Sequence, residues 1–310
     1  MTLSNSTAKV TLNDGNQLPY VGLGTWQSKE NDAYKAVVAA LKAGYRHIDT
    51  AAIYGNEEEV GRAIKDSGVR RSEIFVTTKL WGTQHRHPDD ALNQSLERLG
   101  LDYVDLYLMH WPVPINDAQC KKDNNYLQIP MNEDGTRDLD LASWDFIKTW
   151  ELMQALPKSK VKSIGVSNFS INNIKDLLAS PGNKEVPVVN QVELHPLLPQ
   201  FELVEFCKSK NIVVEAYSPL GSTGAPILEL GTINEVSKKL AIPPANVVFS
   251  WLIQRKIVVL PKSVTESRII SNLQTMELPA EEFSKLNNIS SEVGEKRSVK
   301  PNWTPFIPFV

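Results

Sequence analysis

The sequence predicts a single α/β domain, residues 1–310, folded as a (β/α)8 TIM barrel. Its 310 residues are 42% hydrophobic, which is enough to bury one large core. Short β-branched runs alternate with amphipathic helical segments, an order typical of a parallel sheet closed into a barrel. Seven of these runs end in polar residues, and in such a barrel the strand ends meet at one mouth. These residues are Asp49, Lys79, His110, Ser167 with Asn168, Gln191, Tyr217 and Lys262.

The first predicted element is a hairpin that precedes the repeat. The runs KVTL and QLPYV flank Asn13-Asp14-Gly15, and glycine accepts the positive φ that a tight turn needs. We expect this hairpin to close the end of the barrel opposite the mouth.

The repeat contains eight predicted strands and eight predicted helical segments. The strands are expected at 21–24, 46–49, 74–78, 103–109, 161–166, 187–191, 212–217 and 257–260. The helices, with apolar residues at three- and four-residue spacing, are expected at 31–43, 57–67, 88–99, 143–156, 170–179, 199–210, 232–255 with a break at Pro243-Pro244, and 265–275. A doubly wound sheet is the alternative. However, the segment nearest to its phosphate-binding turn, Gly22-Leu23-Gly24-Thr25-Trp26, lacks the third glycine.

Two long segments lie outside the repeat. Residues 111–142 form a polar stretch with prolines, much longer than an ordinary barrel loop, and we expect a flap over the mouth. The tail, about 290–310, ends in PNWTPFIPFV, where prolines exclude a helix and aromatic residues need a surface to cover. We expect it to fold over the same mouth, with packing on the outside of the barrel as the alternative.

Composition and charge exclude several classes of function. A net charge of −3 gives no electrostatic reason to expect a nucleic-acid or anionic-membrane partner. The N-terminus lacks the features of a signal peptide, and no apolar run is long enough to span a membrane. Cys120 and Cys207 are too few for a disulfide framework or a zinc set and fit a reducing compartment. We therefore expect a soluble cytoplasmic enzyme.

Four ionisable residues form the predicted catalytic set. Asp49, Lys79 and His110 end successive strands, and Tyr54 follows Asp49 in the loop before the next helix. Each alone is more often a structural ion pair or an interior side chain, but together they are expected to converge. In this hypothesis Tyr54 protonates a developing alkoxide. Lys79, held by Asp49, lowers the tyrosine pKa from about 10, and a neutral His110 orients the substrate oxygen.

Beyond these residues, longer motifs resemble the aldo-keto reductase family over essentially the whole chain. They are GYRHIDTAAIYGNEEEVG, LERLGLDYVDLYLMHWP, GVSNF, NQVELHP, EAYSPLG and LPKSVTESRIISN, in the order of that family. Within the family, the chain is similar to fungal NADP-dependent members of the glycerol dehydrogenase or broad carbonyl reductase type. The resemblance implies a (β/α)8 barrel, a monomer, no metal, and reversible hydride transfer between NADPH and an aldehyde or ketone. It assigns the same four catalytic residues, with Tyr54 as the proton donor.

The resemblance also implies which residues hold the nicotinamide and the pyrophosphate. Tyr217 would stack on the nicotinamide, while Ser167, Asn168 and Gln191 would hydrogen-bond its carboxamide. The pyrophosphate would lie on the loop after the seventh strand, although a flexible surface turn at 221–225 is the alternative. The other residues implied near this part of the cofactor are Gly24, Thr25, Trp26, Asp49, Ser218, Leu220 and Ser222.

The residues expected around the adenosine end of the cofactor explain the expected preference for NADP over NAD. A lysine point charge and an arginine fork together suit a 2′-phosphate. Arg268 and Asn272 are four residues apart on the last predicted helix and so share a face. The residues implied here are Lys262, Ser263, Val264, Arg268 and Asn272.

The residues predicted near the adenosine end include one candidate structural motif and one departure from the family pattern. Ser263 and Glu266 have the spacing of a helix capping box, a structural role that is compatible with binding. Ser271 departs from the family pattern, in which many members carry Glu or Gln. It leaves the degree of the NADP preference open.

The substrate pocket is expected to be aromatic. Trp26, Trp81 and Trp111 each follow a strand end, whereas the tryptophans on helical segments, at 144, 150 and 251, are expected in the core. The pocket has no obvious cationic clamp for a substrate carboxylate, and Lys121 or Lys122 of the flap is the candidate for one. The full predicted lining is Trp26, Trp81, His110, Trp111 and Trp303.

Two other functions fit parts of the sequence. One is a regulatory, redox-sensing barrel that binds NADPH with little turnover, but the complete catalytic set favours turnover. The other is an aldolase in which Lys79 forms a Schiff base. That mechanism needs a lysine without a dedicated carboxylate, and it leaves Tyr217 and Lys262 unexplained.

Overall fold

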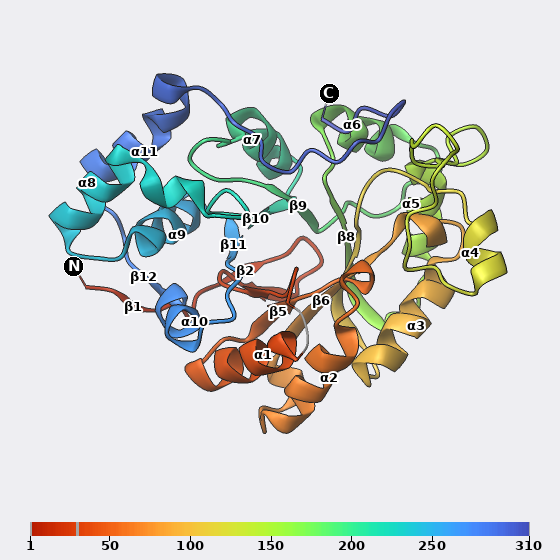
Figure 1. Ribbon diagram of the computed structural model, residues 1–310, viewed down its shortest axis with the longest axis horizontal. Helices are drawn as coiled ribbons and strands as arrows, with labels where there is room; N and C mark the ends of the chain where they lie inside the picture. The colour runs from red at the N-terminus through yellow and green to blue at the C-terminus, as the bar shows by residue number, and fades with distance from the viewer. Residues whose placement is uncertain (1, 29–30, 310) are drawn as a thin grey trace.

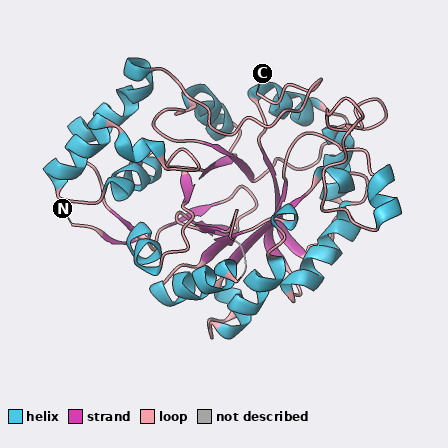
Figure 2. Ribbon diagram, in the orientation of Figure 1, coloured by secondary structure: helices cyan, strands magenta, loops and turns pink. Residues whose placement is uncertain are grey.

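The chain forms an eight-stranded parallel barrel surrounded by helices, as Figure 2 shows. The computed structural model describes residues 2–28 and 31–309. Val21 pairs with Val259 in a parallel bridge that joins the first and last strands. The predicted fold class is therefore confirmed. The strands, in order around the barrel, are β4 (Leu23–Gly24), β5 (His47–Asp49), β6 (Phe75–Leu80), β7 (Val104–Met109), β8 (Val161–Ser167), β9 (Val189–Glu193), β10 (Val213–Tyr217) and β11 (Val258–Leu260).

Helices cover the outside of this barrel, as Figure 1 shows. Those in or near the predicted positions are α1 (Asp32–Ala43), α2 (Glu57–Asp66), α3 (Pro88–Leu99), α5 (Phe146–Gln154), α6 (Ile171–Ala179), α7 (Phe201–Ser209), α8 (Gly231–Leu240), α9 (Pro244–Gln254) and α10 (Glu266–Asn272). The break predicted at Pro243-Pro244 separates α8 from α9. Ala241 is left-handed there, with φ 54°, and Pro244 takes the first position of α9, where its missing N–H costs no helical hydrogen bond.

The structure differs from the predicted elements near the C-terminus. The helix expected at 265–275 is shorter, because Gln274–Thr275 form β12 and pair with β1 (Ser4–Asn5) near the N-terminus. A further helix, α11 (Ala280–Val293), was not predicted and packs against α8. Such a long-range pairing leaves no local signal in the sequence, whereas α11 follows Pro279 and has ordinary helical periodicity.

The predicted hairpin is confirmed. β2 (Lys9–Thr11) pairs with β3 (Gln17–Pro19), and Gly15 has a φ of 89° in the turn. Leu18 is fully buried in a cluster that includes Leu106 and Leu108 of β7. Asp14 accepts a hydrogen bond from the Ser163 hydroxyl, near the start of β8, over 2.6 Å. The hairpin therefore closes the amino-terminal end of the barrel, which leaves the carboxyl-terminal end as the mouth.

The segment 111–142 lies against the loop that follows β6. Trp81 donates to the Gln128 carbonyl over 3.0 Å, and Thr83 donates to the Tyr126 carbonyl over 2.6 Å. The segment also contains a short helix, α4 (Ala118–Asp123), which was not predicted. Because both donors belong to a loop at the mouth, this segment borders the mouth as predicted.

The tail begins later than expected, because residues 290–293 belong to α11. Beyond α11 it runs past α7 toward α6 (Figure 1). Trp303 is only 2% exposed and packs with Trp81 and Trp111, which follow β6 and β7. The tail therefore covers the mouth, as predicted, through Val299, Trp303, Phe306 and Phe309, whereas residues 290–293 pack outside the barrel as part of α11. Residue 310 lies outside the described range.

Within the described residues, none of the helices has both the length and the apolar composition that a membrane crossing requires.

Candidate active site

A buried ion pair lies at the centre of the mouth. The Lys79 ammonium donates to the Asp49 carboxylate over 2.6 Å and to the Thr50 carbonyl over 2.8 Å. Asp49 ends β5 and Lys79 lies in the neighbouring β6, so the parallel register brings the two side chains together. Both residues are buried. An ammonium with two acceptors and no contact with water is held as a fixed positive charge.

Tyr54 and His110 lie beside this ion pair. Tyr54 ends a short 3₁₀ turn, Ala52–Tyr54, which Gly55 terminates in a left-handed conformation. The Lys79 nitrogen lies 5.2 Å from the centre of the Tyr54 ring. The rings of Tyr54 and His110 meet edge to face, with their centres 5.7 Å apart. The structure thus brings together all four residues of the predicted catalytic set.

The pKa of Tyr54 differs from the expectation. Burial raises its pKa above 10, Lys79 opposes that shift, and Asp49 adds to it. The predicted effect of Lys79 is present, but the expected net lowering is wrong for this structure because desolvation dominates. Tyr54 therefore holds its proton firmly until a substrate oxygen becomes basic enough to accept it.

Lys79 and His110 have shifts that fit their predicted charges. Burial works against the charge on Lys79, but Asp49 and Tyr54 outweigh it and raise the lysine pKa. Burial, followed by Lys79, lowers the pKa of His110 well below 6.5, so that its imidazole is neutral. A permanently charged lysine is a poor nucleophile, because attack on a carbonyl requires the free amine. This geometry argues against the Schiff-base alternative.

Hydrogen bonds link the residues predicted to hold the nicotinamide carboxamide. Asn168 has a φ of 62° and donates to the His110 carbonyl over 2.9 Å. Its own oxygen accepts from the Tyr217 hydroxyl over 2.7 Å. Ser167 donates to the Gln191 backbone carbonyl over 2.8 Å. These contacts join the ends of β7, β8, β9 and β10 into one edge of the mouth.

The residues at the end of β4 lie next to Asp49. Thr25 is buried, and both its backbone N–H and its hydroxyl donate to the Asp49 carbonyl, each over 3.1 Å. Gly24 donates its N–H to the Pro261 carbonyl over 3.0 Å, which places β4 beside the segment that leads to Lys262. Trp26, which is predicted to line the pocket, is 42% exposed.

The loop after β10 has an unusual backbone. Ser218, Ser222 and Ala225 have positive φ values of 48°, 70° and 49°. The loop closes on itself through hydrogen bonds from Gly221 to the Ser218 carbonyl and from Ala225 to the Ser222 carbonyl. Leu220 packs partly buried against the core. The three residues predicted to bind the pyrophosphate, Ser218, Leu220 and Ser222, therefore lie on one compact loop.

The residues predicted to bind the adenosine end of the cofactor differ in their exposure to solvent. Lys262 and Arg268 are exposed, and neither forms an ion pair with any residue that the structure describes. Val264 is also exposed, whereas Ser263 and Asn272 are buried. Two cations close in sequence and without carboxylate partners fit a phosphate group.

The capping box predicted for Ser263 and Glu266 is wrong. Thr265 is the cap of α10 and makes no side-chain capping bond, while Ser263 accepts from the Thr265 N–H over 3.1 Å. The helix begins later than the capping pattern requires, so the serine closes a turn instead. Ser271, which departs from the family pattern, donates to Asn246 of α9 over 3.2 Å.

An aromatic cluster covers the mouth. The ring of Trp303 lies 5.4 Å from that of Trp111 and 6.2 Å from that of Trp81, and Trp81 meets His110 at 5.5 Å. Arg137 of the flap segment stacks over Trp303 at 4.0 Å. Lys121, one of the two candidate flap lysines, pairs with Asp117.

The helical tryptophans are core residues in two cases of three. Trp150 and Trp251 are fully buried, as expected. Trp144 is partly exposed, and Arg86 stacks over its ring at 4.4 Å. Its position before the first turn of α5 places it outside the helix–barrel interface.

Two buried glutamates at the barrel strands, Glu193 and Glu215, were not among the predicted site residues. Glu193 ends β9 and accepts the N–H groups of Ser298 and Val299 over 2.7 and 2.8 Å, so it fastens the tail. Glu215 lies inside the barrel and accepts from Gln191 over 2.7 Å. Both stand in buried apolar strands, VPVVNQVE and IVVEAY, and a charged residue in such a run was the available signal.

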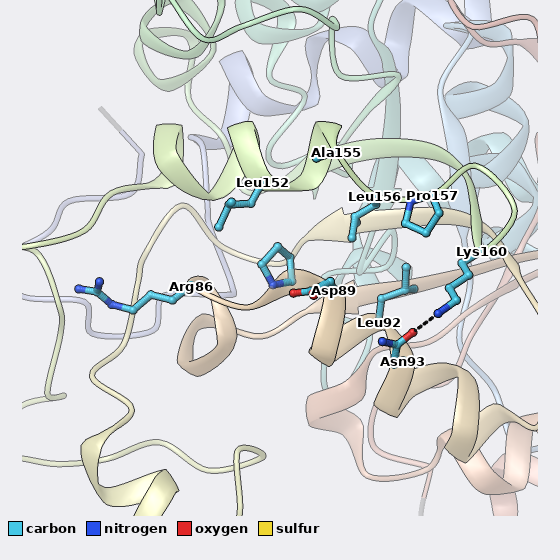
Figure 3. Close-up of a pocket in the computed structure, with 10 residues that line it drawn as sticks. Arg86, Asp89, Leu92, Asn93, Leu152, Ala155, Leu156, Pro157 and Lys160 are labelled. Carbon is cyan, nitrogen blue, oxygen red and sulfur yellow. Dashed lines mark hydrogen bonds between the residues drawn. The ribbon is translucent and has the colours of Figure 1, made fainter.

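A groove of about 420 Å³ lies elsewhere, between α3 and α5 on the outside of the barrel (Figure 3). Leu92, Leu152 and Leu156 line it, and Lys160 donates to Asn93 at one end over 2.7 Å. None of the predicted site residues lines this groove, so it is separate from the mouth.

Known proteins with the same sequence pattern share this architecture. Residues 20–291 match the sequence model of the aldo/keto reductase family. The chain is 64% identical to the glycerol 2-dehydrogenase (NADP(+)) of Saccharomyces cerevisiae, with 99% of each chain covered. It is 60% identical to an aldehyde reductase of the same yeast, with 98% of each covered. The solved aldose reductase of Schistosoma japonicum superposes with a TM-score of 0.85 at 35% identity, with 94% of each chain covered.

Proposed function

Since the chain belongs to the aldo/keto reductase family, we propose that its mouth reduces aldehydes and ketones to alcohols with NADPH, through Asp49, Tyr54, Lys79 and His110. The observation that carries this assignment is the buried Lys79–Asp49 pair beside the Tyr54 and His110 rings. When bound, NADPH supplies the hydride.

Each of the four residues has a distinct part in moving the proton. A carbonyl oxygen that receives negative charge needs a proton, and the Tyr54 hydroxyl donates it. Lys79 then stabilises the phenolate that remains, and its own charge is held by Asp49. The neutral His110 donates one hydrogen bond to the same oxygen and fixes its direction. Reversal of these transfers oxidises an alcohol.

The residues of the cofactor set fit such a dinucleotide from end to end. Tyr217 is half-buried at the mouth and offers a ring face to the nicotinamide. Asn168, Ser167 and Gln191 lie together at the ends of β8 and β9, which supports their assignment to its carboxamide. The loop containing Ser218 and Ser222 receives the pyrophosphate, and the unpaired cations Lys262 and Arg268 receive the 2′-phosphate.

The aromatic residues that cover the mouth indicate the class of substrate. Trp81, Trp111 and Trp303 form an apolar wall above the polar Tyr54 and His110, which suits a small to medium aldehyde, α-keto ester or dicarbonyl. The yeast relatives act, by their names, on glycerol and on aldehydes. Glyceraldehyde and glycerol therefore belong in the first substrate panel.

We also propose that the enzyme is a cytoplasmic monomer of one domain. A single chain supplies the catalytic residues, the flap and the tail tryptophan, so the site needs no second subunit. Cys120 and Cys207 are both buried and unpaired, as in proteins of a reducing compartment. Light scattering of the purified protein tests the oligomeric state.

The reductase assignment is tested by following NADPH absorbance with a panel of aldehydes, ketones and polyols. We expect NADPH oxidation with several aldehydes, and loss of it in Tyr54→Phe. Tight NADPH binding without turnover on any member of the panel would instead support a regulatory barrel. Borohydride trapping with substrate distinguishes the third case, because only a Schiff base leaves a covalent adduct on Lys79.

A further inference from the structure

Glu215 is a buried carboxyl group beneath the catalytic residues. It lies in β10, is fully buried, and has Val189–Glu193 of β9 on one side and Val258–Leu260 of β11 on the other. Burying a carboxyl group is costly unless it has partners. Its position therefore needs an explanation beyond packing.

The contacts of Gln191 supply that explanation. Its side-chain nitrogen donates to Asp49 Oδ2 over 2.8 Å and to Glu215 Oε2 over 2.7 Å. An amide has two N–H donors, so both are used, and its oxygen is the group left for another partner. A flipped amide would place that oxygen against two carboxyl groups. The two acceptors therefore determine which way the Gln191 amide points.

We propose that Glu215 is a positioning residue that, with Asp49, fixes the Gln191 amide so that its oxygen accepts an N–H of the nicotinamide carboxamide. The proposal rests on the proposed function, which places the nicotinamide at Gln191. Glu215 itself does not touch the cofactor and acts through Gln191.

The surroundings of Glu215 also determine its charge. Its Oε1 has no hydrogen-bond partner among the described residues and faces His47 Nε2 at 3.9 Å. Burial, and then Asp49, raise the pKa of Glu215 to about 8, against the weaker effects of Gln191 and Lys79. Burial lowers the pKa of His47 to about 4, so this histidine is neutral. At pH 7 Glu215 is therefore neutral, and the positive charge of Lys79 is compensated by Asp49 alone.

Ionisation of Glu215 adds a negative charge under the nicotinamide. Oxidised nicotinamide carries a positive charge and reduced nicotinamide carries none. Raising the pH through about 8 should therefore strengthen NADP⁺ binding relative to NADPH binding. A carboxyl group that stayed ionised throughout this pH range would not produce this difference.

The experiment measures the dissociation constants of NADPH, NADP⁺ and 2′-phosphoadenosine diphosphoribose, which lacks the nicotinamide, by calorimetry. Glu215→Leu removes the acceptor for Gln191 and should weaken NADPH about tenfold, with the fragment changed by less than about twofold. Glu215→Gln keeps an acceptor oxygen and should bind NADPH within about threefold of wild type. It should also lose the change in NADP⁺ preference near pH 8.

Glu282→Gln is the matched control. Glu282 is equally buried but pairs with Lys239 and Lys285 between α8 and α11, and it makes no hydrogen bond or ion pair with Gln191 or Asp49 in the part of the chain that the structure describes. Its substitution should leave all three dissociation constants unchanged, and circular dichroism should show that each variant is folded.

Several outcomes would overturn the positioning role. One is an equal loss of NADPH and fragment in Glu215→Leu, and another is wild-type NADPH binding by that variant. If Glu215→Leu does not fold, NADPH binding more than about tenfold weaker in Glu215→Gln also overturns it, because that variant keeps an acceptor oxygen for Gln191. Failure of the proposed function is distinguishable, because it would appear as absent NADPH-linked turnover in the wild-type protein.

Discussion

The Lys79 ammonium lies 5.2 Å from the centre of the Tyr54 ring, and both groups lie in the wall of the same mouth. At this distance the charge of Lys79 favours the phenolate, while burial favours the neutral phenol. The balance leaves Tyr54 protonated before the reaction and its conjugate base stabilised afterwards. A proton donor for a developing alkoxide needs both properties.

Tyr54→Phe should therefore remove turnover and leave NADPH binding intact. Loss of a general acid typically costs about 10²- to 10⁴-fold in rate. The variant keeps the ring beside His110, so the packing of the mouth should not change. Steady-state kinetics and calorimetry of NADPH check the two halves of the prediction. A variant that kept full activity would show that another group donates the proton.

Lys262→Ala and Arg268→Ala should each weaken NADPH much more than NADH. Both side chains are exposed and lack ion-pair partners among the described residues, so their removal should leave the fold intact. Losing one charge-assisted contact with a phosphate should cost about ten- to a hundredfold in affinity. Lys208→Ala, an exposed lysine on α7, is the matched control. Equal losses for NADPH and NADH would remove the 2′-phosphate assignment.

The local parts of this site were predictable from sequence, whereas its long-range contacts were not. A parallel barrel gathers strand ends, so Asp49, Lys79 and His110 could be placed together from their order alone. The tail contact of Glu193 is different, because it joins β9 to Ser298, more than a hundred positions away. The pKa of Tyr54 also depended on tertiary structure. Proximity to Lys79 was predictable, but the larger effect of burial on the tyrosine pKa could not be inferred from the order of the strands.

Glu193→Gln should loosen the tail and change substrate selection more than cofactor binding. Glu193 is buried and accepts from Ser298, Val299 and His195, which is 2.9 Å away, so a neutral amide should weaken these bonds. We expect the KM for a bulky aldehyde to change severalfold, with the NADPH dissociation constant within about twofold.

Trp303→Ala supplies the comparison, because it removes the tail's contact with Trp81 and Trp111 directly. The two variants should shift the order of preferred aldehydes in the same direction. An unchanged substrate profile in Trp303→Ala would refute the assignment of the tail to the pocket.

Glu215 should also make stability depend on pH. The pKa of Glu215 is about 8 in the folded chain, and the ordinary value of 4.5 applies to the unfolded chain. Between these pH values Glu215 is ionised in the unfolded chain but still protonated in the folded chain. The folded state therefore loses stability as pH rises from about 4.5 to about 8, and the penalty is constant above that range. Glu215→Gln has no proton to lose, so its stability relative to wild type should increase over the same interval, by at least about 1 kcal/mol.

Urea unfolding at pH 5, 6.5 and 8 measures this difference. Glu282→Gln should behave in the opposite way, because it leaves the buried side of Lys239 and Lys285 without a carboxylate and should destabilise the chain. Parallel curves for wild type and Glu215→Gln at all three pH values would mean that Glu215 ionises at its ordinary pKa in the folded barrel. In that case Glu215 would be ionised at pH 7, and its charge beneath the nicotinamide would be present throughout the neutral range.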